Sequence, residues 1–82
     1  MQINSIKYVK DFIIEINSLN GETYNIDLER QIREFIEKYD RFNELLNLDY
    51  FKNFRLNKKW NTIEWDNGFD ICPDLLELKI PA

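Results

Sequence analysis

The sequence predicts an α+β fold: a small antiparallel β-sheet built from two hairpins, in the order strand-strand-helix-strand-strand, with one main helix packed on one face. The prediction rests on three observations. Apolar residues alternate over residues 12–28, recur at helical spacing over residues 28–39, and alternate again over residues 51–65. The chain of 82 residues is long enough for a single domain, which we assign to residues 1–82.

The alternation over residues 12–28 predicts the first hairpin. Residues that share a face and lie opposite each other should form three pairs: Ile16 with Tyr24, Ile14 with Ile26, and Phe12 with Leu28. This register leaves Leu19-Asn20-Gly21 as a three-residue loop, which favours glycine with a positive φ in third place. We also expect a short strand over residues 3–9.

One apolar stripe predicts the main helix at about residues 28–39. Its members are Leu28, Ile32, Phe35, Ile36 and Tyr39. Asp27 is placed to cap the first turn. The stripe continues loosely through Phe42, Leu45 and Leu46, which predicts either a second short helix at 41–46 or an extension of the first to residue 46.

The second hairpin is expected to pair Leu56 with Ile63 and Phe54 with Trp65, with residues 58–61 as a four-residue loop. Beyond it, Asn67-Gly68 predicts a turn, after which Phe69 and Ile71 return to the core. A last helical turn is expected over residues 73–78, because proline is tolerated at a first helical position.

Charge and composition narrow the classes of function. Eleven Lys+Arg stand against fifteen Asp+Glu, a net charge of −4. This balance argues against general nucleic-acid binding and against docking on an anionic membrane. The chain has no apolar run near 18 residues and does not begin like a signal peptide. One cysteine cannot form an internal disulfide, so we expect a reducing, cytoplasmic location.

Residues suited to catalysis or metal binding are scarce. Histidine is absent, which removes the usual general base and transition-metal ligand. Gly21 and Gly68 stand alone, so no glycine-rich phosphate loop is expected. We interpret Cys72 as a small buried hydrophobe, and the spacing of Asp66, Asp70 and Asp74 differs from that of a calcium loop. We therefore expect no catalytic, cofactor or metal site, and no enzymatic activity.

Five residues are candidates for binding a partner: Trp60, Glu64, Asp66, Asp74 and Glu77. Trp60 lies in a predicted turn, where it either folds back as core or anchors an interface. The four acids belong to a segment without basic residues, which follows the basic run Lys52, Arg55, Lys58 and Lys59. Either the two runs neutralise each other across the hairpin, or the acids form a surface that attracts a protein with a basic surface.

Residues 62–76, TIEWDNGFDICPDLL, resemble the ending of the bacterial family known as domain of unknown function 2442, T-I-x-W-x-N-G-x-D-x-x-P-D-x-L. The matching positions are Thr62, Ile63, Trp65, Asn67, Gly68, Asp70, Pro73, Asp74 and Leu76. Upstream, FNELLNLDYFKNFRL and NGETYNIDL are similar to further elements of the family. The chain departs from the family at Glu77, where tyrosine is usual, and at Trp60, where small or polar residues are usual.

The resemblance implies a small α+β protein without assigned catalytic residues, in a family where some members are encoded beside another small protein in pairs that look like toxin–antitoxin modules. Our leading hypothesis is a non-enzymatic cytosolic protein-interaction domain, the antitoxin-like component of such a module. The alternative is a phage- or mobile-element-encoded acidic inhibitor that blocks a host defence protein by occluding its nucleic-acid-binding surface. Pairing between copies through sheet edges stays open.

Overall fold

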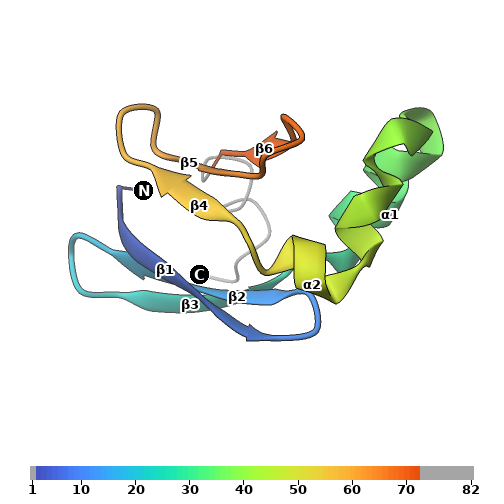
Figure 1. Ribbon diagram of the computed structural model, residues 1–82. Helices are drawn as coiled ribbons and strands as arrows, with labels where there is room; N and C mark the ends of the chain where they lie inside the picture. The colour runs from blue at the N-terminus through green and yellow to red at the C-terminus, as the bar shows by residue number, and fades with distance from the viewer. Residues whose placement is uncertain (1, 73–82) are drawn as a thin grey trace.

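The computed structural model describes residues 2–72, which form two three-stranded antiparallel sheets joined by a helical segment (Figure 1). The first sheet has the order β1-β2-β3 and the second the order β4-β5-β6. The elements are β1 (Ile3–Lys10), β2 (Ile13–Ser18), β3 (Thr23–Asp27), α1 (Glu29–Lys38), the 3₁₀ helix η1 (Asp40–Leu46), α2 (Leu48–Phe51), β4 (Arg55–Asn57), β5 (Thr62–Glu64) and β6 (Asp70–Ile71).

The α+β class is confirmed, while the arrangement of the strands differs from the expected single sheet. β1 and β4 contact each other, yet each hairpin belongs to its own sheet. The helical segment lies to one side of the two sheets, which face each other (Figure 1). The chain passes through α2 before β4, and the second hairpin forms a sheet of its own instead of extending the ladder of the first. The apolar core consequently fills the space between the sheets and α1.

The first sheet has the predicted register. Ile16 lies opposite Tyr24 and Ile14 opposite Ile26, and the Leu28 N–H donates to the Phe12 carbonyl at 2.9 Å. Gly21 has a φ of 90°, as a three-residue loop requires. The expected strand over residues 3–9 is present as β1, which pairs with β2.

The helical segment is interrupted where an extension was one alternative. α1 ends at Lys38, and Tyr39 has a φ of −137° and a ψ of 79°, which no α-helix accommodates. The following turns are a 3₁₀ helix that buries Phe42 and Leu45, as the apolar stripe predicts. Asp27 lies one residue before the N-cap, and its Oδ1 accepts the Glu29 N–H at 3.0 Å. Tyr39 itself is exposed, so its assignment to the buried stripe was wrong.

The second hairpin pairs Leu56 with Ile63, as predicted, but its first strand is shorter than expected. Residue 51 belongs to α2, so the extended chain begins only at β4. The turn at residues 67–68 is confirmed by a φ of 94° at Gly68. Phe69 and Ile71 are buried, as expected. The helical turn expected over residues 73–78 lies outside the described residues.

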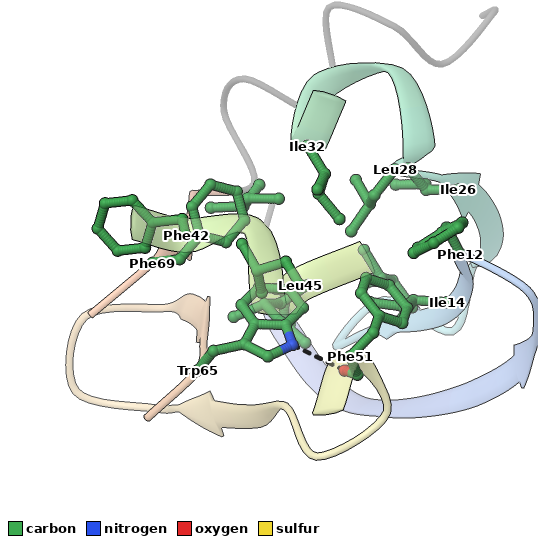
Figure 2. Packing of buried hydrophobic residues seen from close by; sticks show 14 residues of the cluster. Phe12, Ile14, Ile26, Leu28, Ile32, Phe42, Leu45, Phe51, Trp65 and Phe69 are labelled. Atoms are coloured by element: carbon green, nitrogen blue, oxygen red, sulfur yellow. Dashed lines mark hydrogen bonds between the residues drawn. The ribbon is translucent and has the colours of Figure 1, made fainter. Parts of the chain in front are cut away.

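Aromatic rings tie the two sheets to the helical segment. The Phe51 ring lies 5.1 Å from Phe12 and 5.6 Å from Trp65, centroid to centroid. The Trp65 indole also donates from Nε1 to the Phe51 carbonyl at 2.7 Å (Figure 2). Such packing combines apolar burial with a satisfied indole N–H. Trp65 is therefore core, and its ring also contacts Phe54, as predicted.

Candidate functional site

Trp60 lies at the tip of the β4–β5 hairpin and is 69% exposed. Of the two alternatives left open by the sequence, burial of Trp60 in the core is excluded by this exposure. The Trp60 N–H donates to Asn57 Oδ1 at 3.2 Å, which fixes the backbone of the turn. The Lys59 ammonium lies 5.5 Å from the centroid of the Trp60 ring, within cation–π range.

A second large apolar side chain, Leu19, projects from the tip of the β2–β3 hairpin and is 62% exposed. The turn beneath it is held by Ser18, whose Oγ accepts the Glu22 N–H at 3.2 Å. Ser18 is buried although it is polar, and these hydrogen bonds satisfy it. Sequence reasoning did not single out Leu19. An apolar residue in a three-residue hairpin loop carries the same signal that drew attention to Trp60.

One peptide group, between Gln2 and Ile3, connects the two hairpin tips. Its carbonyl accepts the Leu19 N–H at 2.9 Å, and its N–H donates to Asn61 Oδ1, also at 2.9 Å. Asn61 has a φ of 55°, a left-handed conformation that asparagine tolerates better than most residues. Figure 1 shows both tips at the end of the molecule opposite α1.

We call this end the tip surface and define it by Leu19, Lys58, Lys59 and Trp60. Its members come from the loops of two different sheets, and all four side chains are exposed. The hydrogen bonds beneath the tips fix the backbone of both loops. Pre-organisation of this kind lowers the conformational entropy lost on binding.

The acidic candidates Glu64 and Asp66 lie at the base of the same hairpin, away from the tip. Arg55 Nε donates to Glu64 Oε1 at 3.1 Å, and Arg55 Nη1 pairs with Asp66 Oδ1. These hydrogen bonds, above all the one that Asp66 accepts and then the one that Glu64 accepts, raise the pKa of Arg55 above its ordinary value. The structure thus supports neutralisation across the hairpin for these two acids, and it does not bring them together with Trp60.

The other two acidic candidates, Asp74 and Glu77, lie outside the described residues. Within residues 2–72, Cys72 is a free thiol that is partly buried, less so than the sequence predicts. No group of three or more potential ligands gathers in this part of the chain to hold a metal ion. Over the same residues, no helix is long and apolar enough to cross a membrane.

An open groove of about 510 Å³ runs along α1 and is lined only by charged residues among those described. They are Asp27, Glu29, Arg30, Arg33, Glu34 and Glu37. Two ion pairs within the helix neutralise much of this charge. Arg33 Nε lies 2.8 Å from Glu29 Oε2, and Arg30 Nε lies 3.1 Å from Glu34 Oε1. Exposed i,i+4 pairs of this kind are ordinary features of a solvated helix face. The groove therefore has the character of an ordinary solvated helix face.

Comparison with known proteins agrees with the resemblance seen in the C-terminal motif. The chain matches, over residues 3–82, the model of the family described as "Protein of unknown function (DUF2442)". No curated protein and no solved structure matches it significantly. The family match spans both sheets, the helical segment and the motif at residues 62–76 in one continuous stretch. The chain belongs to the DUF2442 family.

Proposed function

We propose that this protein is a non-enzymatic interaction domain that binds a second protein through the tip surface. The observation that carries the proposal is the 69% exposure of Trp60 on a hydrogen-bonded turn. A tryptophan held in water on a fixed turn gains most when a partner buries it, and tryptophan is enriched among the residues that dominate binding energy. Leu19 enlarges the same contact from the neighbouring hairpin.

The finer proposal is that the domain is the antitoxin-like half of a two-protein module. In such a module the small domain covers a surface of its partner, which requires a stable, pre-organised contact and no chemistry of its own. The tip surface suits that task because its two loops are tied to one peptide group. The alternative of an acidic nucleic-acid mimic receives less support, since Glu64 and Asp66 share Arg55 and do not present a row of free carboxylates.

The test is affinity capture from a lysate of the cells that encode the protein, with three immobilised forms of the full chain. Wild-type and Tyr39→Ala should retain the same protein, and Trp60→Ala should lose it. Tyr39 is the matched control because it is an aromatic residue that is 53% exposed and lies beyond α1. The retained protein is then purified and must bind the wild-type chain directly.

The proposal fails if no protein is retained specifically, or if Trp60→Ala retains it as well as wild-type does. A second measurement addresses the enzymatic possibility. Purified wild-type protein is incubated with nuclease, phosphatase and esterase substrates, and turnover that follows the protein through several purification steps would overturn the non-enzymatic assignment.

A further inference from the structure

Among the described residues, the loop that carries Trp60 is positively charged, although the protein as a whole is acidic. Lys58 and Lys59 precede Trp60 in the same loop, and within residues 2–72 neither lysine forms an ion pair. Glu22 is the one acid in the two tip loops, residues 19–22 and 58–61, and its carboxylate accepts the Tyr24 hydroxyl. The tip loops thus carry two positive charges and one negative charge, on a chain with a net charge of −4.

The basic residues nearer the base of the hairpin are in a different situation. Arg55 is shared between Glu64 and Asp66, and Lys52 Nζ lies 3.4 Å from Asp49 Oδ1. Their charge is largely compensated within the fold. Lys58 and Lys59 therefore remain as the positive charges of this hairpin that are available to a partner. They directly precede Trp60, and the Lys59 ammonium lies 5.5 Å from the centroid of its ring.

We infer that the tip surface docks on a protein that presents an apolar pocket rimmed by carboxylates. This inference rests on the proposed function and adds the chemistry of the partner. Trp60 enters the pocket, Leu19 packs beside it, and Lys58 and Lys59 meet the acidic rim. Charges at the rim of an interface mainly steer association and select partners, while the buried aromatic anchor supplies most of the affinity.

The inferred partner differs from the basic one expected from the acidic C-terminal segment. That expectation required Glu64 and Asp66 to present their charge to a partner, whereas both are paired with Arg55. A lipid surface is less well matched than a protein pocket. Two lysines and one tryptophan give only a weak, reversible membrane attachment, and the net charge of −4 opposes an anionic bilayer.

The experiment selects ligands for the immobilised full-length protein from a displayed library of random peptides. Peptides with carboxylates next to an apolar residue are expected. Their affinity should fall by about tenfold or more for Trp60→Ala and for the double variant Lys58→Glu/Lys59→Glu. The double variant Lys10→Glu/Lys38→Glu is the matched control, because it makes the same change in net charge at exposed lysines outside the tip loops.

The control should bind within about twofold of wild-type, and binding of wild-type should weaken as salt is raised. Selected peptides that are basic, or that bind Lys58→Glu/Lys59→Glu as tightly as wild-type, overturn the inference. So does a selection that recovers no peptide dependent on Trp60. Peptides that bind wild-type and Trp60→Ala equally through another surface would overturn it while leaving a protein-interaction function in place.

A lipid arm runs in parallel, with vesicles of phosphatidylcholine with and without phosphatidylglycerol. Trp60 is exposed and Trp65 is buried, so a shift of tryptophan emission to shorter wavelength on adding vesicles reports entry of Trp60 into the bilayer. No shift is expected. A shift that requires phosphatidylglycerol and is lost in Lys58→Glu/Lys59→Glu would make an anionic lipid surface the occupant and overturn the protein pocket.

Discussion

Two tryptophans stand five positions apart on either side of β5, and the fold treats them in opposite ways. Trp65 is 2% exposed, donates its indole N–H to the Phe51 carbonyl and touches three phenylalanine rings. Trp60 is 69% exposed and contacts only the ammonium of its neighbour Lys59 among the described ring and cation contacts. Trp65 is thus packed against other side chains of the same protein, whereas the Trp60 ring has a single such contact among the described residues.

Under the proposed function, this difference separates stability from recognition on a single hairpin. Burial of Trp65 removes a large apolar surface from water, so it contributes directly to the free energy of folding. Trp60 contributes much less to folding, because 69% of it stays exposed to water in the native state. Substitutions at the two positions should consequently affect different measurements.

The largest expected effect is that of Trp65→Ala. Removing this buried indole should lower the free energy of unfolding by about 3–5 kcal/mol, which is enough to unfold a marginal small domain. Urea denaturation followed by circular dichroism measures it. Trp65→Phe keeps much of the packing and leaves the Phe51 carbonyl without the indole donor, so a smaller loss of about 1–3 kcal/mol is expected. Equal losses for both variants would contradict this assignment.

Asn61 tests whether the tip surface depends on its link to β1. Asn61→Ala removes the acceptor of the Ile3 N–H and forces alanine into a φ of 55°, so a loss of about 2 kcal/mol is expected. Asn61→Gly removes the same acceptor without the backbone strain and should lose about 1 kcal/mol. If glycine destabilises the fold as much as alanine does, the strained backbone is not the reason.

Gly21 tests the neighbouring tip. It has a φ of 90° and open space where a Cβ would lie, so Gly21→Ala changes backbone strain without a steric clash. A loss of about 1–2 kcal/mol is expected in thermal or urea unfolding. Gly21→Asn is the control, because asparagine accepts positive φ more readily than alanine. Asparagine should therefore be the milder substitution, and the reverse order would count against the loop geometry.

The smallest effect on stability is expected for Trp60→Ala, within about 0.5 kcal/mol of wild-type. Its tryptophan emission should retain only the contribution of the buried Trp65, at shorter wavelength. Urea denaturation and fluorescence on the same samples provide both readouts. A decrease in the free energy of unfolding comparable to that of Trp65→Ala would show that Trp60 belongs to the core. The two tryptophans would then not differ in their contribution to stability.

Local pairing could be predicted from the sequence because strands obey a period of two. The pairs Ile16–Tyr24 and Leu56–Ile63 followed from keeping apolar residues on one face, since a slip of one residue would expose them all. The arrangement of the hairpins could not be predicted in the same way. It depends on the break at Tyr39 and on the turn of α2, which are set by tertiary packing and not by periodicity.

The candidate site was only partly accessible to sequence reasoning. Trp60 could be singled out because tryptophan is costly to leave in a solvated turn, but its exposure was undecided between two alternatives. Leu19 was missed because its hairpin is linked to that of Trp60 only through the Gln2–Ile3 peptide group, which is far from both in the sequence. For Glu64 and Asp66, the alternative of neutralisation by the basic run agrees with the structure. Both acids pair with Arg55 at the base of the hairpin.

The hydrogen bond from Ile3 to Asn61 spans 58 positions of the sequence. Contacts with such a separation are costly in loop-closure entropy and form only after most of the intervening chain has ordered. The two tips are thus aligned late, when both sheets exist. We expect the local β2–β3 hairpin to form before the complete tip surface does. A partner that requires Leu19 and Trp60 together would bind only the fully folded protein. Binding would therefore begin only after folding is complete.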